Sequence, residues 1–192
     1  MARHWSGFIF FLVLTIAANA APLGINPNGN QVQQLALPGT RVVVLFFTAS
    51  DCPISNRYIP EIARLRHEFA AKHVVFWWVF PNREDTPEIV KIHQRQFSVD
   101  GDTILDTKQT LVQMAHVTTT PESAVFAVIH GRLLEIYHGR VDDRYVSIGQ
   151  ERPQPTRHDL EEAISSALDH RPVSQPVTRP VGCSIVPLSA VQ

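Results

Sequence analysis

Two cysteines, Cys52 and Cys183, are the residues of this chain best suited to covalent chemistry. Cys52 is followed by Pro53 and comes shortly after a continuous apolar run at residues 42–47. A proline at the first position of a helix costs little, because its missing N–H would be unpaired there in any case. The sequence therefore predicts that Cys52 lies between the end of a buried strand and the start of a helix.

This position favours a reactive thiol at Cys52. The free N–H groups and the dipole at a helix N-terminus stabilise the thiolate, which is the form that attacks disulfides or peroxides. The carboxyl end of a central strand is also where open α/β sheets tend to bind ligands. A buried structural cysteine is the alternative interpretation, and the position in the chain favours the reactive thiol over it.

Apolar periodicity predicts the elements that surround Cys52. The runs at 42–47 and 74–80 are continuous and apolar, as in central strands covered on both faces, and apolar residues recur at helical spacing after Pro53. A second helix is expected at 86–97, with Thr86 as its cap. The other expected elements are a strand at 103–105, a helix at 107–115, a hairpin of strands at 123–129 and 133–138, and a helix at 156–168 that begins with a capping box of Thr156 and Asp159.

The ends of the chain differ in composition from its middle. Residues 1–20 combine a basic start, an apolar run and the triplet Ala18-Asn19-Ala20, which predicts a signal peptide cleaved after Ala20 and a periplasmic or secreted protein. The apolar run is too short to span a bilayer, so no membrane span is expected after cleavage. Residues 21–30 are expected to form a loose arm and 31–170 one domain. Residues 171–192 are expected to form a proline-rich tail, without helix or sheet, that carries Cys183.

Charge and ligand spacing exclude several classes of function. Lys and Arg total 17 against 18 Asp and Glu, so no overall field attracts nucleic acid or an acidic membrane surface. The histidines form no pair spaced four apart and neither cysteine has a second cysteine at ligand spacing, so we expect no metal and no other cofactor. The charged residues Arg140, Asp142, Asp143 and Arg144 are expected to form an ion-paired surface loop rather than a substrate groove.

From about residue 33 to residue 168 the chain resembles the thioredoxin-like superfamily. Cys52-Pro53-Ile54-Ser55 stands where that family carries C-x-x-C, so Ser55 replaces the second cysteine, and Thr120-Pro121 resembles the segment that holds the family's cis-proline. The resemblance implies an α/β fold, a three-layer α/β/α sandwich with a central mixed sheet and an irregular C-terminal tail. It also implies that Ser55 supports the Cys52 thiolate by a hydrogen bond and that Thr120 and Pro121 shape a substrate cleft.

The string Asp-Cys-Pro-Ile-Ser-Asn at 51–56 resembles the redoxin branch, which is related to AhpC/TSA-like peroxiredoxins and periplasmic thiol-disulfide reductases. The branch implies a thiol-dependent oxidoreductase with protein thiols or disulfides as substrates and an unidentified electron donor. Peroxiredoxins need a hydroxyl residue three positions before the cysteine and a proline four before that, where this chain has Ala49 and Leu45. A peroxidase acting on a peroxide is therefore the alternative function, and a non-catalytic binding or assembly module is the second alternative.

Cys183 in the tail is a candidate for the second thiol that a C-x-x-S site lacks. Such a site can attack a disulfide but cannot release the mixed disulfide through a second thiol of its own. Cys183 is the candidate resolving thiol if the tail folds back. A permanent structural disulfide, a bridge between molecules and an idle thiol remain open for Cys183. The sequence thus predicts an exported thiol-disulfide oxidoreductase with Cys52 as its nucleophile.

Overall fold

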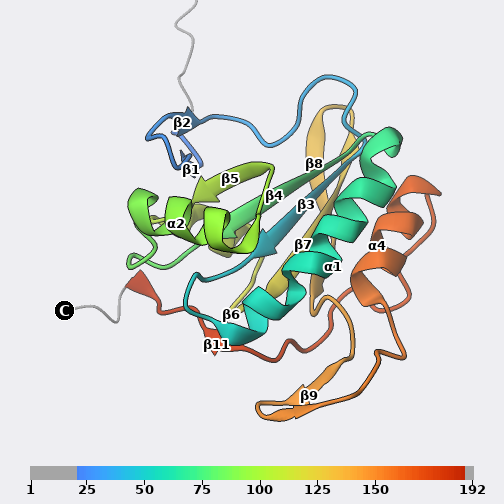
Figure 1. Cartoon of the computed structure of the whole chain (residues 1–192). Coiled ribbons are helices and arrows are strands. Elements are labelled where there is room, and N and C mark those ends of the chain that lie inside the picture. Colours follow the sequence, from blue (N-terminus) through green and yellow to red (C-terminus); the bar gives the residue numbers. More distant parts are fainter. Residues whose placement is uncertain (1–20, 189–192) are drawn as a thin grey trace, which may run out of the picture.

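The structure is a computed structural model that describes residues 21–188, in which helices cover a central mixed sheet (Figure 1). The expected signal peptide at 1–20 lies outside the described residues. The strands are β1 (Gly24–Ile25), β2 (Gln31–Val32), β3 (Val42–Phe47), β4 (Val74–Phe80), β5 (Asp102–Leu105), β6 (Thr119–Thr120), β7 (Glu122–Ile129), β8 (Arg132–Gly139), β9 (Tyr145–Ser147), β10 (Gln150–Glu151) and β11 (Cys183–Ser184). The helices are α1 (Pro53–Phe69), α2 (Pro87–Phe97), α3 (Thr110–Met114) and α4 (Asp159–Leu168), with a 3-10 turn at Ala70–Lys72.

The sheet places β3 at its centre. The strand order is β2-β1-β5-β4-β3-β7-β8, in which β3, β4 and β5 run parallel and β7 runs antiparallel to β3. Every residue of β3 is buried, and successive side chains enter opposite apolar clusters, as expected for a strand covered on both faces. The carboxyl end of this central strand leads directly to Cys52.

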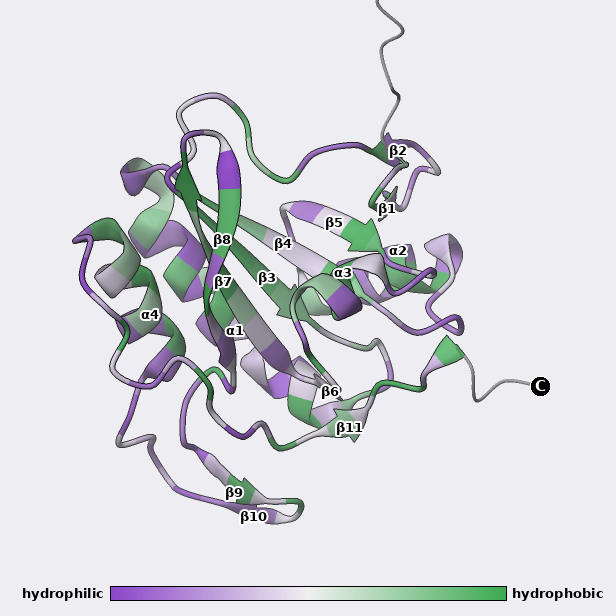
Figure 2. Cartoon of the chain, turned by 180° about the vertical axis from the view of Figure 1, so that it is seen from behind, coloured by the Kyte–Doolittle hydropathy of each residue, from purple (hydrophilic) through white to green (hydrophobic). Residues whose placement is uncertain are grey.

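Helices cover the two faces unequally. Apolar side chains of α1, α2 and α4 join the cluster on one face, and α3 covers the other face together with Leu35 and Ile185 from irregular segments. Figure 2 shows α3 on this second face. The α/β sandwich predicted from the resemblance is confirmed. Within residues 21–188, no helix is long and apolar enough to cross a membrane.

The arm at 21–30 is not loose, which corrects the expectation from its turn-forming composition. Its strand β1 pairs antiparallel with β2 and with the edge of β5. A side chain at Gly24 would come within 2.5 Å of Ile104 Cγ2, so the glycine permits this close approach. The arm therefore extends the sheet by one short hairpin.

The last helix begins at Asp159, so the predicted capping box at Thr156 is wrong. The Thr156 N–H and hydroxyl donate instead to the carboxylate of Asp143, at 2.6 Å and 2.5 Å. His158 occupies the cap position of α4 without a side-chain hydrogen bond. Asp143, which is distant in the chain, therefore binds the Thr156 hydroxyl that the local pattern assigned to the helix cap.

The expectation that the tail forms no sheet is also wrong. Cys183 and Ser184 form β11, which pairs antiparallel with β6. The prolines at 180 and 187 flank this segment, and the N–H groups between them remain able to donate. One of them, from Ile185, donates to the carbonyl of Thr118 at 2.9 Å. The tail is therefore extended, as its prolines favour, but docked.

Candidate active site around Cys52

Cys52 lies at the start of α1, where the sequence places it. It is the cap residue of the helix, with extended backbone angles, and its carbonyl accepts from the N–H of Asn56 at 3.0 Å. Pro53 occupies the first turn of α1. The side chain of Cys52 is fully buried, so its sulfur is enclosed by protein in this conformation.

The segment before β7 faces the Cys52 sulfur. The peptide bond between Thr120 and Pro121 is cis, as the resemblance implies. The Cys52 thiol donates to the carbonyl of Thr120, with 3.3 Å between the sulfur and the oxygen. Thr120 is buried and belongs to β6, so its backbone lies between the reactive sulfur and the paired tail strand.

The tail brings Cys183 to Cys52. The two Sγ atoms lie 2.7 Å apart, and both residues are present as free thiols, Cys52 buried and Cys183 exposed. Cys183 is the register partner of Thr120 in the pairing of β11 with β6. The structure thus joins Cys52, Cys183 and Thr120 in one site, although the two cysteines are 131 positions apart in the sequence.

The two thiols differ in acidity. Burial raises the pKa of Cys52, but the hydrogen bond from Cys183 and the nearby polar groups of Ser55 outweigh burial, and the pKa is lowered overall. Burial and the hydrogen bond with Cys52 both raise the pKa of Cys183. The Ser55 hydroxyl is buried and makes no hydrogen bond, so the hydrogen bond to Cys52 that the resemblance implies is not formed in this conformation. Ser55 lowers the pKa of Cys52 as a nearby polar group. Cys52 is therefore the more acidic thiol of the pair.

A polar network behind the Cys52 loop was not predicted from the sequence. The Ser50 N–H and hydroxyl donate to Asp85 Oδ1 at 3.1 Å and 2.5 Å. The Asn56 side chain donates to the Ser50 carbonyl at 3.2 Å and lies 2.8 Å from His93 Nε2. Burial raises the pKa of Asp85 and lowers the pKa of His93. The sequence could have indicated Asp85 as a site residue. It follows the end of β4, and β4 is the parallel neighbour of β3, so both strands end at the same edge of the sheet.

The same network bears on the hydroxyl group that a peroxiredoxin needs. The buried residue three positions before Cys52 is Ala49, which has no hydroxyl. The neighbouring Ser50 donates its hydroxyl to Asp85, so it does not replace the missing group. The Thr48 hydroxyl is buried without a hydrogen-bond partner. The structure therefore offers Thr48 as the hydroxyl that remains unengaged next to this position.

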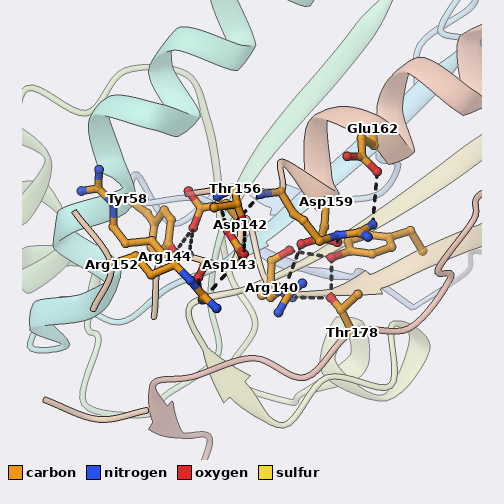
Figure 3. A network of polar contacts seen from close by, with 12 residues as sticks. Tyr58, Arg140, Asp142, Asp143, Arg144, Arg152, Thr156, Asp159, Glu162 and Thr178 are labelled. Carbon is orange, nitrogen blue, oxygen red and sulfur yellow. Dashed lines mark hydrogen bonds and ion pairs between the residues drawn. The ribbon is translucent and has the colours of Figure 1, made fainter. Parts of the chain in front are cut away.

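Of the four charged residues that follow β8, Arg140 and Asp143 form ion pairs, and the segment is less exposed than a surface loop (Figure 3). The Tyr58 hydroxyl donates to Asp142 at 2.5 Å, and Arg140 forms an ion pair with Asp159 at 2.7 Å. Asp142, Asp143 and Asp159 are buried. These residues join α1, β8 and the start of α4, so their contacts are those of a structural junction.

A cluster with metal-ligand spacing is found among the described residues at Glu61, His158 and Glu161. Arg64 forms ion pairs with both glutamates, so a cationic side chain already neutralises these carboxylates. The cluster lies between α1 and the start of α4 and includes neither cysteine. It supplies no group to the chemistry at Cys52.

Comparison with known proteins agrees with this fold. Residues 16–132 match the AhpC/TSA family. The chain has no match among curated proteins. It is similar to solved structures of an uncharacterized conserved protein from Geobacillus kaustophilus (23% identity, TM-score 0.71, covering 87% of this chain and 89% of that one) and a hypothetical protein from Sinorhizobium meliloti 1021 (20% identity, TM-score 0.71, covering 90% and 94%). It is also similar to a thiol:disulfide interchange protein of the thioredoxin family from Chlorobium tepidum TLS (16% identity, TM-score 0.52, covering 79% and 99%). These structures share the thioredoxin-like fold, and since the family match spans more than half of its length, the chain belongs to the AhpC/TSA family.

Proposed function

We propose that the protein is a thiol-disulfide oxidoreductase in which Cys52 and Cys183 form the redox pair. The observation that carries this proposal is the 2.7 Å separation of the two sulfur atoms at the start of α1. The unequal acidity of the two thiols supports it, because exchange needs one thiolate nucleophile and one thiol that reacts afterwards.

The reductive half of the cycle uses both cysteines in turn. The Cys52 thiolate attacks one sulfur of a substrate disulfide, which breaks that bond and releases the first substrate thiolate. Cys183 then loses its proton to the solvent or to the departing sulfur and attacks Cys52. This step releases the second substrate thiolate and leaves a Cys52–Cys183 disulfide. The substrate gains two electrons and the cysteine pair loses two.

The cycle is completed by a donor thiol, for which Cys183 is the accessible target. Cys183 is exposed and Cys52 is buried, so the donor attacks the sulfur of Cys183. Cys52 leaves as a thiolate, and a thiol of lower pKa is the better leaving group. A second donor thiol then releases Cys183, so that two donor thiols become one disulfide.

A peroxidase is the second candidate, and the observation in its favour is that Cys183 would also trap a sulfenic acid formed on Cys52. The missing hydroxyl at Ala49 and the engaged hydroxyl of Ser50 weigh against it. A binding or assembly module that keeps the cysteines without turnover is the third reading. We also propose export, on the strength of residues 1–20, which would bring the pair into a compartment that permits disulfides.

The first test follows the reduced protein in two separate reactions, one with a protein that carries disulfides, such as native insulin, and one with hydrogen peroxide. We expect exchange with the disulfide, an end product with a Cys52–Cys183 bond by mass spectrometry, and peroxide consumption at the rate of an ordinary thiol. Cys183→Ser should stop at a mixed disulfide on Cys52, and Cys52→Ser should be inactive. Activity retained in Cys52→Ser would contradict the proposal. A peroxide rate orders of magnitude above that of a free thiol would favour the peroxidase, and no turnover on either substrate would favour the module.

A further inference from the structure

The tail crosses the active site as an extended strand, with the backbone of 118–120 as its partner. β11 pairs with β6 in the register Cys183 with Thr120 and Ser184 with Thr119. The Ile185 N–H donates to the Thr118 carbonyl at 2.9 Å, which continues the pairing. Figure 1 shows β11 beside β6, near the start of α1. The backbone groups at 118–120 therefore act as an edge that binds an extended chain.

Gly182 gives this pairing a sequence requirement. A Cβ atom at Gly182 would lie 2.1 Å from the Thr120 carbonyl oxygen and 2.9 Å from Pro121 Cδ. The oxygen belongs to the backbone, so a flexible side chain cannot move away to make room. The residue that precedes the cysteine in this strand must therefore be glycine if the chain is to pair as closely as the tail does.

Ile185 gives a second requirement, two positions after the cysteine. Its side chain is 6% exposed and belongs to the apolar cluster that includes Leu111 and Val117. Its neighbours Ser184 and Val186 are exposed, as expected from the alternation of side chains along a strand. The backbone edge at 118–120 and the apolar site that Ile185 fills together form the groove in which the tail strand lies.

The docked tail also closes the site. Cys52 is fully buried, so a substrate disulfide cannot reach its sulfur until the tail strand moves away. The tail keeps an anchor outside the groove at Thr178, whose hydroxyl lies 2.7 Å from the Tyr137 hydroxyl and accepts from the Arg140 N–H at 3.1 Å (Figure 3). The strand can therefore leave the groove while the chain stays attached at Thr178.

We infer that residues 181–185 are an internal ligand of the substrate cleft expected at Thr120 and Pro121, and that the cleft selects extended polypeptides with a Gly-Cys-x-apolar segment whose apolar residue takes the place of Ile185. The inference rests on the proposed function and names its substrate class. A substrate strand displaces the tail when its cysteine reaches Cys52. When Cys183 attacks the resulting mixed disulfide, the returning tail strand takes the same backbone partners and expels the product.

The test uses the full chain carrying Cys183→Ser, with Cys52 held as a mixed disulfide to 5-thio-2-nitrobenzoate. A peptide with the sequence of residues 180–187 attacks the Cys52 sulfur through its own thiolate and releases the coloured thiolate, which absorbance follows. The comparison peptides carry Gly182→Ala or Ile185→Ser, and free cysteine reports exchange without a groove. Because burying a misplaced atom or losing an apolar anchor commonly changes affinity by about tenfold, we expect the unaltered peptide to react ~10-fold faster than either altered one.

Changes in the tail of the protein itself give a second measurement. Ile185→Ser, added to the Cys183→Ser chain, should weaken the internal ligand and speed the reaction with the unaltered peptide, while the exposed Val186→Ala should leave it unchanged. Equal rates for all three peptides, with free cysteine still releasing the coloured thiolate from Cys52, would contradict the inference about the groove. The proposed redox function would not be affected by that result. A chain that no thiol discharges, free cysteine included, would overturn both.

Discussion

The sulfur of Cys52 is acidified by its neighbours in spite of burial, and Cys183 is the first of these neighbours. Replacing Cys183 with alanine removes that hydrogen bond, so the pKa of Cys52 should rise and its thiolate fraction at neutral pH should fall. Cys183→Ser keeps a donor of similar size at the same place. We therefore expect the pKa of Cys52 in Cys183→Ser to stay closer to that of the reduced wild type than in Cys183→Ala.

Ultraviolet absorbance of the thiolate, titrated against pH in the three reduced proteins, measures this difference. Cys52→Ser in the same titration supplies the background. If the curve of Cys183→Ala coincides with the wild-type curve, the acidity of Cys52 comes from the helix start and Ser55 alone, and the assigned role of Cys183 is wrong.

At the residue scale, the sequence predicted the parts of the site that depend on local pattern. The position of Cys52 was predicted because a strand, a cysteine and a proline at a helix start are neighbours in the chain, and the cis bond before Pro121 was expected from the resemblance. The meeting of Cys183 with Cys52 stayed open, because a proline-rich tail has no periodicity that says where it docks. Asp85 and His93 were missed because their roles depend on contacts with Ser50 and Asn56 across the fold.

Among the carboxylates of the junction that leads into α4, Asp143 has the lowered pKa. Burial tends to raise the pKa of Asp143, but hydrogen bonds from Thr156 and Arg157 and the charge of Arg152 lower it to about 2. A carboxyl group with a lowered pKa contributes stability that is fully present above its ordinary pKa of 3.8 and is lost as the pH falls toward 2. Asp143→Asn should therefore lower the free energy of unfolding at pH 7 by about 1 to 2 kcal/mol.

Urea unfolding of both proteins over a series of pH values tests this expectation. The gap between wild type and Asp143→Asn should be constant at neutral pH and should narrow as the medium becomes more acidic than pH 3.8. Asp169→Asn is the control, because it breaks an exposed ion pair with Arg171 and should change stability little. A gap that stays the same down to pH 2 would show that the Asp143 charge contributes nothing to the junction.

Elements were predicted well where a continuous apolar run or a helical stripe determines them, as at β3, β4 and α1. Errors occur where a distant group changes a local pattern. Thr156 reads as a helix cap in sequence, yet Asp143 takes its hydroxyl, and α4 begins at Asp159. β11 was not predicted, because its partner β6 lies far away in the chain. The flanking prolines suggested a segment without sheet, although the residues between them keep N–H groups that can donate.

For the molecule as a whole, the tail connects the last part of the chain to the start of α1. Its contacts include the Thr178 hydroxyl, the pairing of β11 and Ile185 in the apolar cluster, and the Val186 carbonyl also accepts from the Gln109 side chain at 2.7 Å. A disulfide between Cys52 and Cys183 would make this connection covalent. It would close a loop between residues 131 positions apart and so restrict the unfolded chain far more than the folded one.

The oxidised protein should therefore be more stable than the reduced protein, by about 2 to 5 kcal/mol according to the behaviour of disulfides that close long loops. Urea unfolding with and without a reductant measures the difference, after mass spectrometry has verified the Cys52–Cys183 bond in the oxidised sample. Cys183→Ser is the matched control and should unfold at the same urea concentration in both conditions. If the oxidised and reduced wild type also unfold together, closing this loop does not stabilise the fold. The covalent link between the tail and the start of α1 would then contribute nothing to the free energy of unfolding.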